Sequence, residues 1–167
     1  MIDSNAEQKY LVLDAPTGSG KTHLLAQYIR SLPPNTRVLS IVSRIGLTKS
    51  LAEKFDMVLY KNRRRNEYPD RLSCTLDHLE QLTYPDPPYD VVILDENGDT
   101  RTHTISPTIQ SRIKTVLSNL NDILLNAKKV ILCQHQMMEP DAYFFLSFEG
   151  VDLYDKNVVR RFAIFQM

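Results

Sequence analysis

A short glycine-bearing loop between an apolar segment and a helical pattern constrains this chain more than any other feature. The loop has the sequence Ala15-Pro16-Thr17-Gly18-Ser19-Gly20-Lys21-Thr22-His23. Before it, residues 10–13 form an apolar run without helical spacing, which is typical of a buried strand. After it, apolar residues at positions 24, 25, 28 and 29 recur with the spacing of a helix. A strand, a glycine loop and a helix in this order predict a phosphate-binding loop.

The residues of this loop suit the chemistry of phosphate binding. Gly18 and Gly20 allow backbone N–H groups to turn toward phosphate oxygens, and the positive end of the following helix points at the same anion. The Lys21 ammonium can reach the β- and γ-phosphates, and the Thr22 hydroxyl can hold Mg²⁺. We therefore predict ATP and Mg²⁺ as ligands. The predicted ATP contacts are Ala15, Thr17, Gly18, Ser19, Gly20, Lys21, Thr22 and His23. The strict pattern has glycine where Ala15 stands, and an ordinary glycine-rich turn is the alternative.

Length, composition and charge narrow the class of protein. A chain of 167 residues, 43% hydrophobic and 24% charged, is expected to fold as one globular domain. Twenty basic residues balance twenty acidic ones, which excludes a diffuse basic surface as the source of nucleic-acid binding but leaves room for a local groove. Cys74 and Cys133 stand in apolar contexts, which favours reduced thiols over a disulfide. No apolar run approaches the roughly 18 residues of a membrane helix, so we expect a soluble, intracellular protein with no membrane partner.

The rest of the chain alternates strand-like and helix-like segments. Strands are expected at residues 37–42, 57–60, 73–75, 89–94, 129–133, 151–154 and 162–165. Helices are expected at residues 21–31, 45–55, 106–127 and 141–148, with a helical turn at 76–82. Strands that are nearly continuously apolar and alternate with helices predict an α/β fold, a mostly parallel sheet with helices on both faces. We expect one P-loop domain over residues 1–167.

An acidic pair follows the clearest of these strands. Asp95 and Glu96 come directly after the apolar run at residues 89–94. Ligands collect at the carboxyl ends of strands in such sheets, the edge where the phosphate loop is also expected. Asp95 can hold Mg²⁺ through water, and Glu96 can position or deprotonate the water that attacks the γ-phosphate. We therefore predict Lys21 and Glu96 as catalytic residues, with Thr22 and Asp95 as the metal ligands. The alternative is an acidic pair that only solvates a strand end.

Several segments resemble the motifs of superfamily 2 helicases. Residues 15–22 look like motif I, in which alanine is common at the first position, and Asp95-Glu96 looks like motif II. Residues 38–44 are similar to motif Ia, closest to the version in the viral and plasmid replication-origin-binding helicases of the herpesvirus type. Residues 72–76 resemble the motif Ib region, and residues 130–136 fall where that family places motif III. The resemblance implies the first of two RecA-like domains of an ATP-driven helicase or translocase in DNA replication. Its expected place is the cytoplasm or the replication compartment of a host cell.

The same resemblance implies partners. It assigns Ser43, Arg44 and Thr75 to a single-stranded nucleic acid, with DNA favoured over RNA. It also implies a second RecA-like domain, which is absent from this chain, or a partner subunit, for full activity. Three features depart from the family: motif II continues as Asn97-Gly98, motif III lacks its usual residues, and no adenine-reading glutamine motif precedes the loop.

Two other functions fit the same loop. A nucleotide or small-molecule kinase would carry arginines on a late lid helix, where Arg160 and Arg161 are the candidates but stand in a strand-like context. A non-catalytic interaction domain would bind nucleotide without turnover. The basic residues 61–65 are interpreted as an exposed loop that could add electrostatic affinity for nucleic acid. No cysteine or histidine spacing supports His103 or His135 as a metal ligand.

Overall fold

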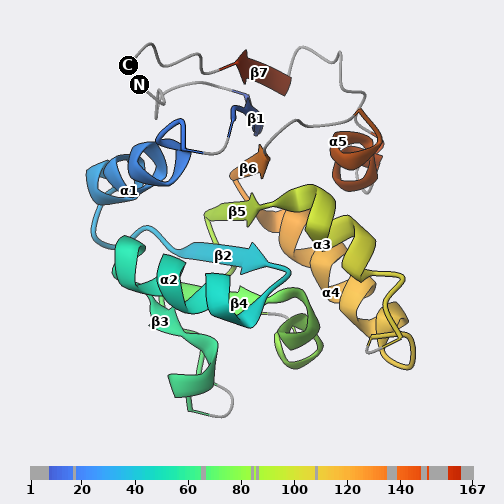
Figure 1. The fold of residues 1–167 in the computed structure, drawn as a ribbon. Coiled ribbons are helices and arrows are strands. Elements are labelled where there is room, and N and C mark those ends of the chain that lie inside the picture. The colour runs from blue at the N-terminus through green and yellow to red at the C-terminus, as the bar shows by residue number, and fades with distance from the viewer. Residues whose placement is uncertain are drawn as a thin grey trace.

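A parallel sheet of seven strands forms the centre of the molecule (Figure 1). The computed structural model describes residues 8–16, 18–64, 67–83, 85, 87–107, 109–134, 139–147, 150 and 158–162. The strands are β1 (Tyr10–Asp14), β2 (Val38–Val42), β3 (Val58–Leu59), β4 (Arg71–Thr75), β5 (Val91–Asp95), β6 (Lys129–Gln134) and β7 (Val158–Phe162). Their order across the sheet is β3-β4-β2-β5-β6-β1-β7, and each neighbouring pair is parallel. The predicted α/β class with a parallel sheet is confirmed.

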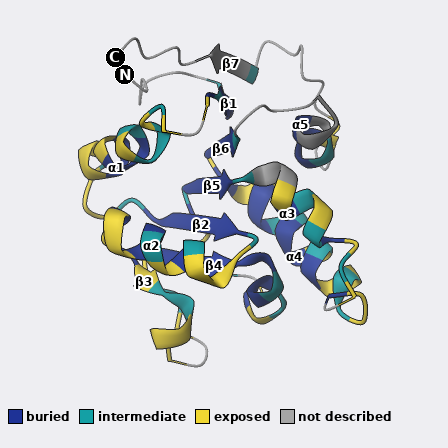
Figure 2. Cartoon of the chain, viewed as in Figure 1, coloured by how far each residue is buried: buried dark blue, intermediate teal, exposed yellow. Residues whose placement is uncertain are grey.

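Helices cover both faces of this sheet. The α-helices are α1 (Lys21–Ser31), α2 (Ile45–Phe55), α3 (Asn97–His103), α4 (Ile113–Asn126) and α5 (Glu139–Leu146), and the 3₁₀ helices are η1 (Tyr60–Asn62) and η2 (Leu76–Gln81). Successive strand residues point to opposite faces, so Leu11 and Leu13 join the apolar cluster under α1 and α2, while Tyr10 and Val12 join the cluster under α4 and α5. Figure 2 shows the buried sheet between helices whose outer sides are exposed.

The long helix predicted at residues 106–127 is wrong in its first part. Residues 106, 107 and 109–112 instead form bends and turns, in which the Ile109 N–H donates to Ser106 O (3.1 Å) and the Arg112 N–H donates to Ile109 O (2.9 Å). These turns place Ile109 in the core and bring the Arg112 guanidinium to 2.8 Å from the Glu80 carboxylate on η2. Tertiary contacts that local spacing does not encode therefore replace the first helical turns. Helix α3 was not predicted, because its polar, glycine-containing sequence has no apolar stripe.

The last strand also differs from the prediction. It covers Val158–Phe162 rather than residues 162–165, and residues 163–167 lie outside the described part of the chain, as does the strand predicted at 151–154. Strand β7 is at the edge of the sheet and pairs with β1, with Arg160 opposite Val12 and Arg161 opposite Leu13. Edge strands accept charged residues, which the search for continuous apolar runs misses.

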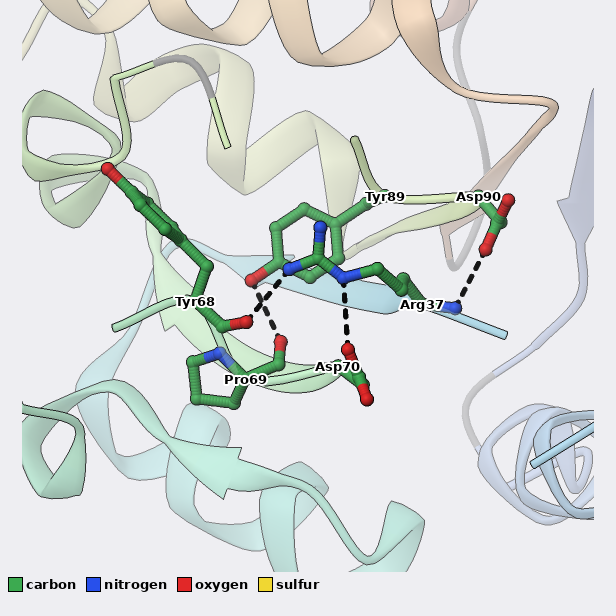
Figure 3. A network of polar contacts seen from close by, with 6 residues as sticks. All are labelled: Arg37, Tyr68, Pro69, Asp70, Tyr89 and Asp90. Atoms are coloured by element: carbon green, nitrogen blue, oxygen red, sulfur yellow. Dashed lines mark hydrogen bonds and ion pairs between the residues drawn. The ribbon is translucent and has the colours of Figure 1, made fainter. Parts of the chain in front are cut away.

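A buried arginine fixes the ends of the sheet opposite the phosphate loop (Figure 3). Arg37 precedes β2 and donates through Nε to the Asp70 carboxylate (3.1 Å) and through Nη2 to Tyr68 O (2.8 Å). Its backbone N–H donates to the Asp90 carboxylate (2.9 Å), and its guanidinium lies 4.6 Å from the Tyr89 ring centroid. These contacts join the chain segments that enter β2, β4 and β5.

Two smaller findings complete the description. Cys74 and Cys133 are both free and buried. Among the described residues, no helix has the length and apolar character needed to cross a bilayer.

Candidate functional site

The predicted phosphate loop joins β1 to α1 and has the backbone that the glycines suggested. Gly18 and Gly20 have φ angles of 80° and 84°, in the left-handed region where a side chain is strained. Gly20 is the N-cap of α1, whose first turn has no acidic residue and, among the residues that the structure describes, no side-chain cap. The free N–H groups at the start of α1 are therefore available to an anion.

Two side-chain donors of the loop, Lys21 and Ser19, have no anionic acceptor among the described residues. The Lys21 ammonium donates to Ala15 O and to Pro16 O (3.1 Å), two carbonyls of the loop itself. The Ser19 hydroxyl is buried and, within the described residues, has no hydrogen-bond partner. A phosphate group in the loop would satisfy both side chains, because its oxygens accept hydrogen bonds from ammonium and hydroxyl groups.

A cavity of about 550 Å³ brings most of the predicted nucleotide residues together. The predicted residues that line it are Gly18, Gly20, Lys21, Thr22, His23, Asp95 and Glu96. Ala15 is buried at the end of β1, beside the cavity lining, where its carbonyl accepts the Lys21 hydrogen bond. Thr17 lies outside the described residues. The cavity volume is within the range of roughly 300–1,000 Å³ of ligand pockets.

Asp95 is a buried carboxyl group at the end of β5. It is 6% exposed, and burial raises its pKa to about 6, with the nearby Glu96 carboxylate contributing to the rise. The Glu96 N–H, which donates to Asp95 Oδ1 at 3.2 Å, and the Lys21 and Lys54 ammonium groups act in the opposite direction on this pKa. A carboxylate held in such surroundings is stabilised strongly by a cation placed beside it.

The backbone of Glu96 is unusual. Its φ and ψ are both 51°, the left-handed conformation that few residues other than glycine adopt. Glu96 is the N-cap of α3, and its carbonyl accepts from the Thr100 N–H (3.0 Å) and the Thr100 hydroxyl (3.3 Å). Strained backbone of this kind often occurs at functional sites, where surrounding contacts hold it in place. The strain marks Glu96 as a residue whose position matters.

The oxygen groups facing the cavity fit Mg²⁺. The Thr22 hydroxyl and the Asp95 carboxyl are hard oxygen ligands on the same cavity. Among the described residues, no cluster of three or more His, Cys, Asp or Glu side chains could hold a metal ion. The two oxygen groups of Thr22 and Asp95 suit Mg²⁺ bound together with phosphates, since this ion commonly takes one or two protein ligands and completes its shell with phosphate oxygens and water.

Sequence reasoning missed part of the cavity wall. Ala26 and Arg30 line it from α1, and Leu47, Glu53 and Lys54 line it from α2. Ala26 and Arg30 follow Thr22 at four-residue intervals, so helical spacing could have identified them once Thr22 was assigned. The residues from α2 could not be found in this way, because they reach the cavity through the packing of α2 against α1.

The predicted nucleic-acid contacts lie at the carboxyl ends of adjacent strands. Ser43 and Arg44 follow β2, and Thr75 ends β4 directly opposite Val42. None of the three lines the nucleotide cavity. The Arg44 guanidinium is exposed and 3.0 Å from the Asp99 carboxylate of α3, while Thr75 is buried. The structure therefore connects the Arg44 position to the helix that Glu96 begins.

The basic residues after β3 are more ordered than an exposed loop requires. Arg63 donates through Nε to His78 (2.9 Å), through Nη1 to Glu67 O (2.9 Å) and through Nη2 to Gln81 O (3.2 Å). His103 faces the Asp77 carboxylate at 3.1 Å, and His135 lies outside the described residues. Lys61 and Arg64 are exposed as predicted, but Lys61 lies in the 3₁₀ helix η1 rather than in a loop, and Arg63 is half-buried.

The burial of His78, together with its contact with Arg63, makes stability depend on pH. Burial and the Arg63 charge lower the pKa of His78 to about 4, from about 6.5 in an unfolded chain. The unfolded state then binds more protons between these values, so the free energy of unfolding should fall as the pH falls from about 6.5 to 4. We expect the free energy of unfolding to fall by about 1–2 kcal/mol, allowing for solvent screening.

Urea unfolding at pH 7 and pH 4.5 would measure this loss of stability. His78→Gln should remove this loss, whereas His23→Gln, at an exposed position, should not. Equal pH dependence in His78→Gln and the unsubstituted chain would contradict the assignment.

Comparisons with known proteins agree with this geometry. The profile of the family described as type III restriction enzyme, res subunit, matches residues 2–141, most of the chain. The comparison with curated proteins finds no match. A solved structure of a mutant large terminase ATPase domain from Thermus phage P74-26 has a TM-score of 0.53 at 15% identity, covering 93% of this chain and 76% of the terminase chain. A second structure of that ATPase domain has a TM-score of 0.51 at 16% identity, with the same coverage.

The two terminase structures show likeness of fold alone, since their identity to this chain is low. The family match is broader evidence, because it spans the phosphate loop, the acidic pair and the strands that carry them. The chain belongs to the type III restriction enzyme res subunit family and is a RecA-like, ATP-binding domain of the superfamily 2 helicase type.

Proposed function

We propose that this domain hydrolyses ATP as the first RecA-like domain of a superfamily 2 DNA helicase or translocase. The observation that carries the proposal is the shared cavity, where Lys21 and Thr22 of the phosphate loop face Asp95 and Glu96 at the end of β5. Groups that bind phosphate and a carboxylate able to position water are the two requirements of ATP hydrolysis.

Each residue has a separate task in this proposal. Lys21 exchanges the carbonyls of Ala15 and Pro16 for the β- and γ-phosphates. Thr22 and Asp95 would hold Mg²⁺, which when bound would supply positive charge beside the phosphates. Glu96 accepts a hydrogen bond from the attacking water and orients it toward the γ-phosphate.

The proposal includes partners outside this chain. A second RecA-like domain or a partner subunit would supply an arginine to stabilise the transition state, a group whose loss costs about 10³–10⁵ in rate in related chemistry. The matched family is named for a restriction enzyme subunit, which favours DNA as the nucleic acid. The narrower likeness to viral and plasmid origin-binding helicases stays a prediction, and with it a role in replication.

The kinase alternative has less support. A lid helix would be needed to carry Arg160 and Arg161, yet both stand in strand β7, paired with β1. Residues paired in the sheet are not part of a lid helix that could close over a second substrate.

Helix α3 supplies a physical route between nucleic acid and ATP. Glu96 begins this helix, Asp99 in its first turn pairs with Arg44, and His103 at its end faces Asp77 of η2. A phosphodiester that binds Arg44 must compete with the Asp99 carboxylate. Displacing Asp99 would act on the helix whose N-cap is Glu96, which supports stimulation of ATP turnover by a nucleic acid strand.

If a phosphodiester replaces Asp99 as the partner of Arg44, substitutions at both residues should change the binding of single-stranded DNA. Arg44→Ala should flatten the log–log salt dependence of single-stranded DNA binding by about 0.7, the contribution of one phosphate contact. Asp99→Asn should strengthen binding about two- to fivefold by removing the competing carboxylate, and this gain should vanish in the double variant. Fluorescence anisotropy of a labelled oligonucleotide across a salt series would measure both. Lys114→Ala, an exposed lysine on α4, is the matched control. An unchanged slope in Arg44→Ala would remove this residue from the interface.

The proposed function as a whole is tested by phosphate release. With the second domain present, ATP turnover should require Mg²⁺ and should rise on addition of single-stranded DNA. Nucleotide binding without turnover under those conditions would instead identify the non-catalytic interaction domain.

A further inference from the structure

A second cavity, of about 870 Å³, lies away from the nucleotide residues. Tyr60, Tyr68 and His78 supply aromatic rings to its lining, and Lys61, Arg63 and Arg64 supply positive charge. Rings interleaved with cations are the composition that binds single-stranded nucleic acid, because bases stack on rings and phosphates attract cations. Its volume is within the range of roughly 300–1,000 Å³ of ligand pockets.

The topology places the Tyr60 and His78 side of this cavity beside the predicted path of a nucleic acid strand, whereas Tyr68 lines the cavity from the segment that enters β4. Arg44 follows β2, Thr75 ends β4 and is the N-cap of η2, and η1 follows β3. Strands β2, β4 and β3 are consecutive in the sheet, so these three positions lie in sequence along its carboxyl edge. Adjacent strands are about 4.8 Å apart, so the path from Arg44 to η1 crosses roughly 10 Å. His78 and Tyr60, on η2 and η1, line the cavity at the end of that path.

The aromatic part of the lining is held in place. The Tyr60 and His78 rings are 4.6 Å apart between centroids. The Tyr68 hydroxyl donates to Thr83 O (3.1 Å), and Tyr68 O accepts from the buried Arg37. Because burial and Arg63 lower the pKa of His78 to about 4, its ring is neutral near pH 7. The cavity thus presents ordered, uncharged rings to a ligand.

The cations divide into one structural group and two exposed groups, of which the Lys61 ammonium lies 5.8 Å from the Tyr60 ring centroid. Arg63 uses its donors on His78, Glu67 O and Gln81 O, so it stabilises the wall. Lys61 and Arg64 are exposed, and within the described residues neither side chain forms an ion pair. Glu80, the acidic residue in the lining, is paired with Arg112 at 2.8 Å. The positive charge of Lys61 and Arg64 is therefore not cancelled from within the cavity.

We propose that this cavity binds one nucleotide of the single strand that crosses Arg44 and Thr75, with its base against Tyr60 and Tyr68 and its phosphates near Lys61 and Arg64. This inference rests on the proposed function, since it assigns the continuation of the same nucleic-acid path. It adds a base contact to contacts that otherwise involve the backbone of the strand. Because every base has a flat face, the site should accept any base sequence.

Base stacking can be tested with the fluorescent base 2-aminopurine, placed at successive positions of an oligodeoxythymidine. The intact chain should quench the fluorescence at one position. Tyr60→Leu should abolish that quenching and weaken binding about tenfold, because it removes the ring and keeps apolar bulk. Tyr60→Phe keeps the ring and should retain both properties. Quenching at no position, or quenching unchanged in Tyr60→Leu, would overturn the proposal. Unfolding curves would reveal a Tyr60→Leu chain that fails to fold. In that case the double variant Tyr60→Phe, Tyr68→Phe replaces it: stacking predicts that this variant still quenches the fluorescence, and loss of quenching would contradict the base site.

The phosphate contacts are tested by salt dependence. Lys61→Ala with Arg64→Ala should flatten the log–log slope by up to about 1.4, two contacts of about 0.7 each, whereas Lys114→Ala should leave it unchanged. A flattened slope with unaltered quenching in Tyr60→Leu would indicate an anion-binding surface, such as one for an acidic peptide, and would reject the base site. Binding that depends on Arg44 but on neither Tyr60 nor Lys61 would refute this inference and leave the proposed function standing. No binding at low salt by the intact chain would overturn both.

Discussion

Glutamine in place of Glu96 should lower ATP turnover by about 10²–10⁴-fold, the range associated with loss of a positioned general base. The glutamine side chain has nearly the same shape but cannot accept a proton from the attacking water. ATP should still bind, because the phosphate loop and Asp95 are untouched. Turnover is measured as steady-state phosphate release with the second RecA-like domain present, and binding by calorimetric titration of the chain.

The same cavity contains a matched control for this experiment. Glu53 lines the cavity from α2 and is exposed, so Glu53→Gln removes one negative charge without touching the predicted water position. Turnover should remain close to that of the unsubstituted protein in Glu53→Gln. Full turnover in Glu96→Gln would mean that another group positions the water, and the strained backbone at Glu96 would need a structural explanation.

Alanine in place of Lys21 should weaken ATP binding by about 10- to 100-fold. The expected net loss is that of one hydrogen bond to a charged group, about 1.5–3 kcal/mol, because Lys21 gives up its bonds to Ala15 O and Pro16 O when it reaches the phosphates. The substitution keeps Gly18 and Gly20 and places a strong helix former at the first residue of α1, while it removes the Lys21 hydrogen bonds to Ala15 O and Pro16 O. Calorimetric titration with ATP and Mg²⁺ would measure the loss.

Lys54→Ala is the matched control, since Lys54 also lines the cavity but comes from α2 rather than the loop. If the lysines only attracted ATP through their charge, both variants would lose affinity to a similar degree. A specific phosphate contact would weaken Lys21→Ala far more. Equal affinity of Lys21→Ala and the unsubstituted chain would remove Lys21 from the phosphate site.

The elements best predicted from sequence are those with a strong local signal. Helix α1 covers Lys21–Ser31 as predicted, because a glycine loop precedes it and Pro33-Pro34 follows. Strand β5 was predicted from its apolar run, and the structure shifts its bounds by only one or two residues. In both cases neighbouring residues alone limit the conformations that the chain can adopt.

The errors occur where a distant segment decides the local conformation. The turns at residues 109–112 form because Ile109 reaches the core and Arg112 reaches η2. Strand β7 includes two arginines because it pairs at the edge of the sheet with β1. Helix α3, which lacks an apolar stripe, packs against α5 and β6.

The sequence by itself determined the phosphate loop, the acidic pair and the parallel sheet that brings them to one edge. It could do so because glycine spacing, helix starts and apolar runs restrict the backbone within a few residues. Only the tertiary structure decided the rest: the Arg44–Asp99 pair, the α2 wall of the nucleotide cavity and the cavity between η1 and η2. Each of these depends on side chains from separate elements, and their distance is set by how whole helices and strands pack.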